Sequence, residues 1–160
     1  MQYNWNWHVF WDIAVEGRPH WILLLQGFGW TIATAMASWA LALLLGTVIG
    51  VLRTLPYRTA RFFGTLYVET FRNVPLLMQV FIWFFVVPEL VPLQLGAALK
   101  QMDDGPFLAA VLAIGFFMAA RIAEQVRAGI QALPRGQSMA GTALGLTRAQ
   151  TYRHILLPVS

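Results

Sequence analysis

The chain has 160 residues, of which 58% are hydrophobic and only 11% are charged, whereas soluble domains carry about 25% charged residues. So little charge cannot coat a soluble globule, and the absence of cysteine excludes disulfide scaffolds, cysteine-bearing zinc sites, iron–sulfur clusters and thiol catalysis. The net charge of +4 is small and no basic stretch is dense, which argues against nucleic-acid binding, so the composition favours a polytopic membrane protein.

Residues 1–29 are predicted to lie at the outer membrane interface, ahead of the first spanning helix. They contain Trp5, Trp7, Trp11 and Trp21, and tryptophans gather at membrane–water interfaces. His8 and His20 lack the helical spacing of a metal-binding pair. We interpret them as interfacial polar residues and predict no metal site.

Three stretches free of Asp, Glu, Lys and Arg predict spanning helices at about residues 30–52, 74–93 and 106–127. The first charge-free run, from Pro19 to Leu52, is long enough by itself, whereas the other two reach roughly 20 residues only with their flanks. The alternative is buried helices of a soluble protein, which so few charges could not cover. Gly46 and Gly50 have the spacing that lets another helix approach closely, although this spacing is common by chance.

The basic residues predict the orientation of these helices. One group lies between the first two helices and another follows from the end of the third: Arg53, Arg58, Arg61, Arg72, Arg121, Arg127, Arg135, Arg148 and Arg153. Arg18 and Lys100 fall on the other side, together with most of the acidic residues. By the positive-inside rule the arginine-rich segments are cytoplasmic, and the N-terminus lies outside.

The chain carries none of the motifs of the common enzyme classes. It has no P-loop, GxGxxG, HExxH or GxSxG, and its acidic residues are scattered. A membrane-embedded enzyme would need clustered acids or histidines inside the spans. We therefore expect no catalysis, no ATP hydrolysis by this chain and no cofactor.

The segment 131–158 is predicted to form a hairpin of two short helices on the cytoplasmic side. Pro134 and Gly136 break the chain after the third spanning helix. Residues 137–144 then form a helix of small and apolar residues, and Gly145 is placed to end it in a left-handed conformation.

A second short helix follows in this hairpin. Thr147 and Gln150 have the spacing of a capping box, and Pro158 is expected to end the helix. A hairpin without enzymatic groups suits docking to a partner protein. A loop that lies on the membrane surface is the alternative, and the residues alone leave both open.

Three segments in this order resemble motifs of the permease subunits of ATP-binding-cassette (ABC) importers for polar amino acids. They are RNVPLLMQ at 72–79, EQVRAGI at 124–130 with LPRGQ at 133–137, and ALGL at 143–146 with ILLP at 155–158. Gly27 and Thr31 match the start of the family's first helix, so the resemblance covers about residues 23–159. It implies an all-α membrane protein with the type I importer (MetI-like) fold, formed by residues 30–160.

In that family a cytoplasmic EAA loop fits a cleft in the ATPase subunit. The resemblance assigns this contact to Gly136, Gln137, Met139, Ala140, Ala143, Leu144 and Gly145. Met139 stands where the family has its loop glutamate, so an ion pair with the ATPase is expected to be lost while apolar docking remains.

The resemblance also implies further partners and a location. They are a second permease subunit and a periplasmic amino-acid-binding protein, in the bacterial inner membrane. Family members continue with further spanning helices after the ILLP element, so the chain is expected to be C-terminally truncated.

Four residues are candidates for the substrate path: Pro75, Gln79, Arg121 and Glu124. Arg121 is expected to face the path and hold the side-chain carboxylate of an acidic amino acid, because charges inside a membrane are costly and usually functional. The spelling AARIAEQVR at 119–127 resembles glutamate/aspartate permeases. Glutamate and aspartate are therefore the first choice of substrate, and glutamine or basic amino acids are the second.

Other interpretations stay open for the same residues. Arg121 could snorkel to the interface or pair with Glu124. Pro75 could be a hinge or simply a first-turn proline. A small membrane channel or scaffold is the alternative for the whole chain.

Overall fold

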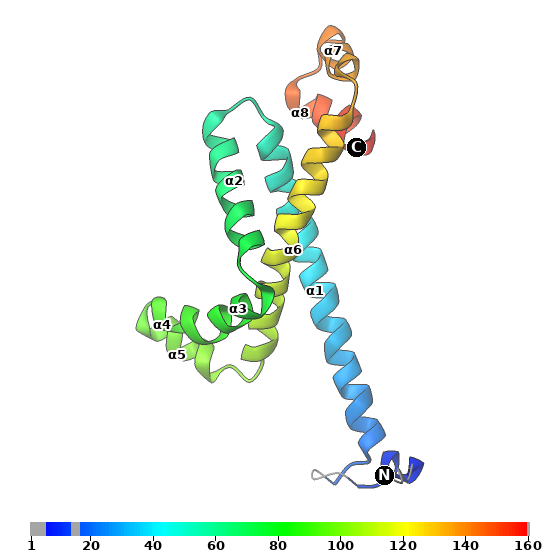
Figure 1. The fold of residues 1–160 in the computed structure, drawn as a ribbon, viewed down its shortest axis with the longest axis vertical. Coiled ribbons are helices and arrows are strands. Elements are labelled where there is room, and N and C mark those ends of the chain that lie inside the picture. The colour runs from blue at the N-terminus through cyan, green and yellow to red at the C-terminus, as the bar shows by residue number, and fades with distance from the viewer. Residues whose placement is uncertain (1–5, 14–16, 160) are drawn as a thin grey trace.

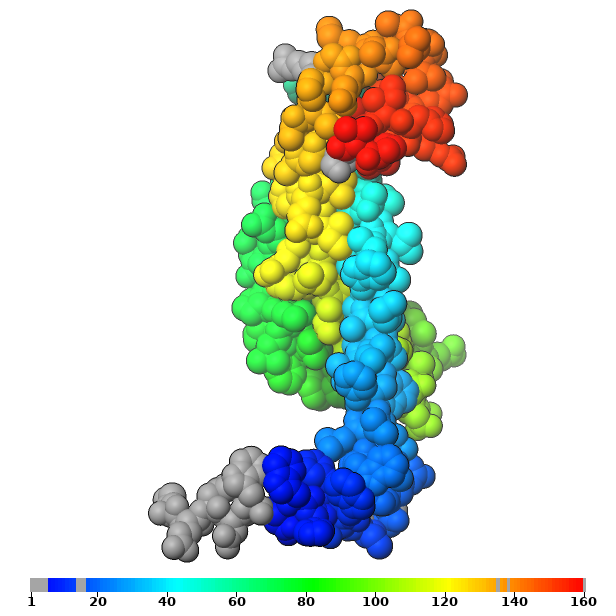
Figure 2. All heavy atoms as spheres, turned by 90° about the vertical axis from the view of Figure 1, so that its right-hand side faces the viewer, coloured from blue at the N-terminus to red at the C-terminus, as the bar shows by residue number. Residues whose placement is uncertain are grey.

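The computed structural model describes residues 6–13 and 17–159, which form mainly helices (Figure 1). The two long helices, α1 (His20–Thr54) and α6 (Gly105–Ala132), lie side by side over much of their length (Figure 1, Figure 2). The short helix η1 (Trp7–Phe10) lies at one end of this pair, and the C-terminal helices lie at the opposite end.

Both long helices are long and apolar enough to cross a membrane, and a third crossing is present if the bent pair Arg58–Asn73 and Leu76–Leu90 forms one span. The helices predicted at 30–52 and 106–127 are confirmed, because they lie inside α1 and α6. Their ends differ from the prediction. α1 fills the whole charge-free run and begins directly after Pro19, so it crosses the expected boundary at residue 29.

Small residues let α1 and α6 approach closely. On α1 the buried positions recur every fourth residue, at Ser38, Ala42, Gly46 and Gly50. A Cβ atom on Gly46 would lie 2.7 Å from the Cβ of Ile122, and one on Gly50 would lie 2.7 Å from the Cβ of Val126. Such distances are too short for real side chains, so the close approach that the glycine spacing predicts is confirmed, with α6 as the partner.

α2 (Arg58–Asn73) runs back along the long pair from the end at which α1 finishes (Figure 1). The charge pattern identifies this stretch only as an arginine-rich connection, whereas the structure shows a 16-residue helix. Gly64 and Val68 are buried, while Arg58 and Arg61 are exposed. Arginines on one face of an amphipathic helix lower the hydropathy of the sequence without interrupting the helix.

The helix predicted at about 74–93 is found as a continuous helical stretch from Leu76 to Leu90, which is shorter than predicted because Pro75 and Pro92 bound it. α3 (Leu76–Phe81) begins after Pro75, the π-helical turn η2 (Ile82–Val86) leads into α4 (Val87–Leu90), and α5 (Leu93–Gln101) begins after Pro92. The axis of α2 and that of the α3–α4 stretch are bent by 103°. The chain therefore turns sharply between Asn73 and Leu76.

Two prolines are carried inside helices by π-helical turns. Pro88 follows η2, and Pro158 follows η3 (Tyr152–Leu156). In these turns the N–H of Val87 bonds to the Ile82 carbonyl, and that of Leu157 bonds to the Tyr152 carbonyl. The wider turn relieves the clash between a proline ring and the carbonyl four residues earlier. The expectation that Pro158 ends its helix is wrong, since α9 (Leu157–Val159) continues through it.

The predicted C-terminal hairpin is formed by α7 (Arg135–Ala143), α8 (Arg148–Thr151), η3 and α9, at the end where α1 meets α2 (Figure 1). Gly145 has a φ of +73°. The N–H groups of Gly145 and Leu146 bond to the carbonyls of Thr142 and Gly141, which closes α7 as a Schellman motif. The capping box of Thr147 and Gln150 is also formed, so both predicted caps are confirmed.

Candidate functional site

An ion-pair cluster joins α1, α2 and α6. On α6, Glu124 Oε1 lies 2.9 Å from Arg53 Nη1 of α1 and 3.4 Å from Arg72 Nη1 of α2, while its Oε2 lies 3.2 Å from Arg127 Nη2. One carboxylate is thus shared by three guanidinium groups from three helices. The predicted path residue Glu124 is engaged within the chain.

Arg53 is the most buried member of this cluster, with 8% of its side chain exposed. Its aliphatic part passes over Gly64 of α2, where a Cβ atom would lie 2.6 Å from Arg53 Cγ. Arg53 and Arg127 were absent from the predicted site, as was Arg72. The sequence motifs contain Arg72 and Arg127, but only the fold brings Arg53 to Glu124, 71 positions away.

Arg121 lies one helical turn before Glu124 and forms no ion pair with the described residues. Its guanidinium carbon instead lies 4.6 Å from the centre of the Phe117 ring, a cation–π contact. The alternative of an Arg121–Glu124 pair is therefore not what the structure shows. Arg121, Arg72 and Glu124 line a shared pocket of about 370 Å³.

Pro75 and Gln79 build the bend between α2 and α3. Pro75 is the residue directly before α3, and Gln79 is 4% exposed. The Gln79 Nε2 donates hydrogen bonds of 2.9 Å to the carbonyls of Phe71 and Val74, which the end of α2 leaves without helical partners. Gln79 thus closes the end of α2, and a hinge role for Pro75 stays a prediction.

Aromatic rings support this bend from the side of α6. The Phe116 ring stacks on Phe71 of α2 at 5.6 Å and on Trp83 of η2 at 5.1 Å between centroids. The Tyr67 hydroxyl donates a 2.9 Å hydrogen bond to the Phe116 carbonyl. The bent segment is therefore held against α6 on both sides of the break.

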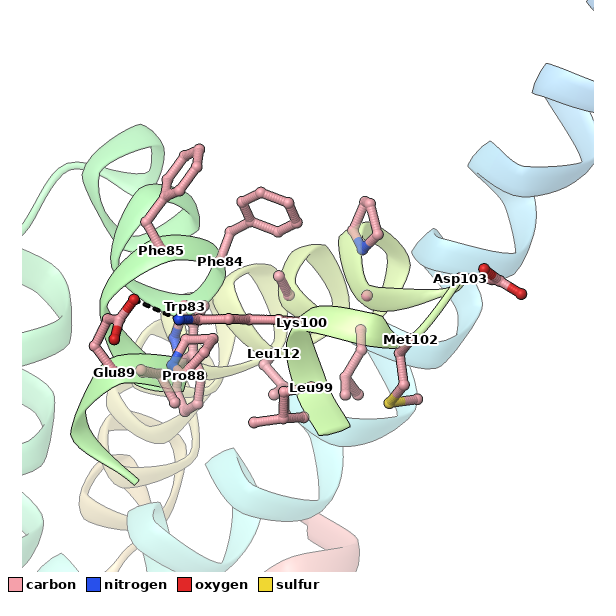
Figure 3. A pocket seen from close by; sticks show the side chains of 15 residues that line it. Trp83, Phe84, Phe85, Pro88, Glu89, Leu99, Lys100, Met102, Asp103 and Leu112 are labelled. Carbon is pink, nitrogen blue, oxygen red and sulfur yellow. Dashed lines mark hydrogen bonds and ion pairs between the residues drawn. The ribbon is translucent and has the colours of Figure 1, made fainter. Parts of the chain in front are cut away.

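A second cavity, of about 480 Å³, lies between η2, α4, α5 and the start of α6 (Figure 3). Its lining is mostly apolar and includes Trp83, Phe84 and Leu112. Lys100 reaches across it from α5 and forms an ion pair with Glu89 (Figure 3). This pair engages the charges of both side chains, and the lining offers no nucleophile with an adjacent base.

The predicted docking residues lie on α7 and the turn after it, at the far end of the molecule (Figure 1). Met139 and Leu144 are 68% and 76% exposed, and Ala140 and Ala143 are exposed beside them. The opposite side of α7 packs on η3, since a Cβ atom on Gly141 would lie 3.1 Å from Ile155 Cδ1. One side of α7 thus packs within the hairpin, and its other side presents an apolar surface.

The remaining predicted docking residues flank this surface. Gly136 and Gly145 are exposed, and Gln137 is half-buried.

Among the histidines, His20 Nδ1 lies 2.8 Å from the Asp12 carbonyl oxygen. Within residues 6–13 and 17–159, no group of three or more His, Asp or Glu residues is placed to hold a metal ion.

Comparison with known proteins identifies a family and several relatives. Residues 42–160 match the family described as "binding-protein-dependent transport system inner membrane component". The glutamate/aspartate import permease protein GltJ of Escherichia coli (strain K12) is 47% identical over 99% of this chain and 66% of its own length. GltK, the glutamate/aspartate import permease protein of E. coli O6:H1, is 36% identical over 92% of this chain and 64% of its own length.

More distant relatives are named for other amino acids. The probable glutamine ABC transporter permease protein GlnM of Bacillus subtilis is 35% identical over 85% of the chain and 58% of its own length. The crystal structure of an amino acid ABC transporter with histidines superposes with a TM-score of 0.59 at 24% identity, over 86% of this chain and 63% of that one, which shows the fold. The chain spans about two thirds of the length of GltJ and GltK.

Proposed function

Because the chain belongs to the family of binding-protein-dependent transport system inner membrane components, we propose that it is a permease subunit of an ABC importer for polar amino acids, glutamate and aspartate first. It is a multi-pass protein of the inner membrane with the ABC permease fold. The relatives named for glutamate and aspartate support the acidic substrates. The relative named for glutamine keeps other polar amino acids as the second choice.

The exposed face of α7 is the observation that carries this proposal. Met139, Ala140, Ala143 and Leu144 form an apolar surface at the end of the two long helices, and such surfaces mark interaction sites. We propose that an ATPase subunit docks there. Met139 supplies apolar contact where the family has a glutamate, so docking depends on burial rather than on an ion pair.

The proposed orientation places α7 in the cytoplasm and η1 outside. The structure puts the α1–α2 connection and the C-terminal hairpin at one end, and the arginine-rich segments predicted to be cytoplasmic include both. Cysteines introduced at the exposed residues Tyr57 and Ala149 should be shielded from an impermeant reagent in intact cells. One at Gln101 should be labelled, and the reverse pattern would overturn the orientation.

The proposed partners are the ATPase, a second permease subunit and a periplasmic amino-acid-binding protein. The test is uptake of labelled glutamate into proteoliposomes that contain the complete transporter and its binding protein. Uptake should require ATP and this chain. A channel or scaffold would instead give ATP-independent uptake or none, and would not retain the ATPase during purification.

A further inference from the structure

Positive charge is in excess where α1, α2 and α6 meet. Arg53, Arg72 and Arg127 share the single carboxylate of Glu124, and Arg121 has no acidic partner among the described residues. Uncompensated charge within a membrane protein is costly and marks functional sites. The cluster therefore favours an additional anion that the described part of the chain does not supply.

Glu124 cannot serve as that anion for Arg121. Its Oε1 accepts a 2.9 Å hydrogen bond from Arg53, and its Oε2 accepts a 3.2 Å hydrogen bond from Arg127 Nε. Arg53 is 8% exposed, and the loss of its partner would leave a buried charge. The carboxylate is thus held by Arg53 and Arg127.

Arg72 is the member of the cluster that can turn to a second anion. Its Nη1 lies 3.4 Å from Glu124 Oε1, the longest of the three contacts, and 53% of its side chain is exposed. Arg72 comes from α2 and Arg121 from α6, and both line the 370 Å³ pocket. The Phe117 ring holds the Arg121 guanidinium beside this pocket without neutralising it.

We propose that Arg72 and Arg121 together bind the side-chain carboxylate of a dicarboxylic amino acid within the membrane, with Glu124 positioning Arg72. This inference rests on the proposed transport function and names the two side chains that would recognise the substrate's side-chain carboxylate. The α-ammonium and α-carboxylate of an amino acid cancel, so net positive charge favours glutamate or aspartate over glutamine. Two planar guanidinium groups can each offer paired donors to one carboxylate.

The test measures selectivity in the complete permease–ATPase complex, without the binding protein, in nanodiscs of phosphatidylcholine. Equilibrium binding of radiolabelled glutamate is compared with that of glutamine, which has the same shape but no side-chain carboxylate. Arg72→Gln and Arg121→Gln should each lower the preference for glutamate by about tenfold. The corresponding Lys variants should show an intermediate preference for glutamate, because they keep the charge but lose the planar pair of N–H donors.

Arg61→Gln is the matched control, because Arg61 is an exposed arginine of α2 without an ion pair among the described residues. It should retain the preference of the unaltered complex. A purely structural role for Arg72 and Arg121 would weaken both amino acids alike, and an unchanged glutamate-to-glutamine ratio would overturn the proposal. Absence of any preference in the unaltered complex would overturn it as well.

A membrane lipid is the competing source of an anion. If the Gln variants lose binding of labelled phosphatidylglycerol while the glutamate preference is unchanged, the pocket is a lipid site and the proposal is wrong. Failure of the transport function is a separate result, since ATP-driven glutamate uptake by the unaltered transporter is measured independently. Normal uptake by the unaltered transporter, together with an unchanged glutamate-to-glutamine binding ratio in the variants, would reject only the two-arginine site.

Discussion

The Tyr152 hydroxyl lies 3.0 Å from Thr54 Oγ1 and joins the C-terminal hairpin to the last turn of α1. Thr54 Oγ1 donates its own hydrogen to the Val51 carbonyl at 2.7 Å, so Tyr152 is the donor in this contact. The hairpin that carries α7 is therefore connected to α6 by the chain and to α1 by this hydrogen bond.

Tyr152→Phe should weaken the coupling between ATP hydrolysis and transport. If the ATPase docks on α7, its movement reaches α1 through this contact, and a neutral hydrogen bond contributes about 1 kcal/mol. We expect a severalfold fall in glutamate transported per ATP hydrolysed, measured in proteoliposomes, with the ATPase still bound. Tyr57→Phe, at an exposed tyrosine of the same end, should have no effect, and equal coupling in both variants would contradict the prediction.

Gly46→Ala should destabilise the packing of α1 on α6. The new Cβ atom would lie 2.7 Å from Ile122 Cβ and 2.8 Å from the Ala119 carbonyl oxygen, and overpacking costs about 1–3 kcal/mol. Thermal unfolding in detergent should show a lower Tm. Gly29→Ala is the control, because a Cβ atom there meets nothing within 4 Å. A similar Tm for both variants would contradict the close approach.

Glu124→Gln should destabilise the junction of the three helices. The amide keeps the shape but removes the charge, which leaves Arg53 buried with like charges beside it. Breaking a buried pair costs about 3–5 kcal/mol, and the value should fall near the lower end because Glu124 is 26% exposed. Glu69→Gln, at an exposed residue of α2, is the control. Chemical unfolding of the purified chain gives the comparison.

Gln79→Leu should loosen the bend between α2 and α3. The substitution removes both hydrogen bonds to the carbonyls of Phe71 and Val74, and unpaired buried carbonyls cost about 1–3 kcal/mol. Hydrogen exchange of the backbone amides around residues 74–79 should become faster. Gln94→Leu, on the exposed surface of α5, is the control and should leave that exchange unchanged. If the Gln79 variant is as well protected as the unaltered chain, Gln79 does not stabilise the bend.

Ala143→Asp should release the ATPase while the permease still inserts into the membrane. The substitution puts a charge into the exposed apolar surface of α7, where docking would have to bury it. Ala149→Asp changes the charge equally at an exposed residue of α8 and should retain the ATPase. Co-purification from membranes measures the difference, and normal retention by the Ala143 variant would refute the docking surface.

Local signals predicted the long helices and the hairpin, because these depend on residues near one another in sequence. Gly145 and the Thr147–Gln150 box act within one turn, and their roles are visible in the sequence. The bend between α2 and α3 was missed because the arginines of α2 marked residues 58–73 as a connection rather than as a helix. The Glu124 cluster was missed because Arg53 reaches it only through tertiary packing.

The length of α1 has a consequence for the bilayer itself. Its 35 residues, at about 1.5 Å each, make a rod of about 50 Å, whereas the hydrocarbon layer is about 30 Å thick. Trp30 packs edge-on against Phe107 near the start of α6, so the preceding turns extend past that helix (Figure 1). Trp21, Leu24 and Phe28 on those turns are exposed and apolar. Hydrophobic mismatch therefore ties the tilt of α1 to membrane thickness, and thicker bilayers should hold it more upright.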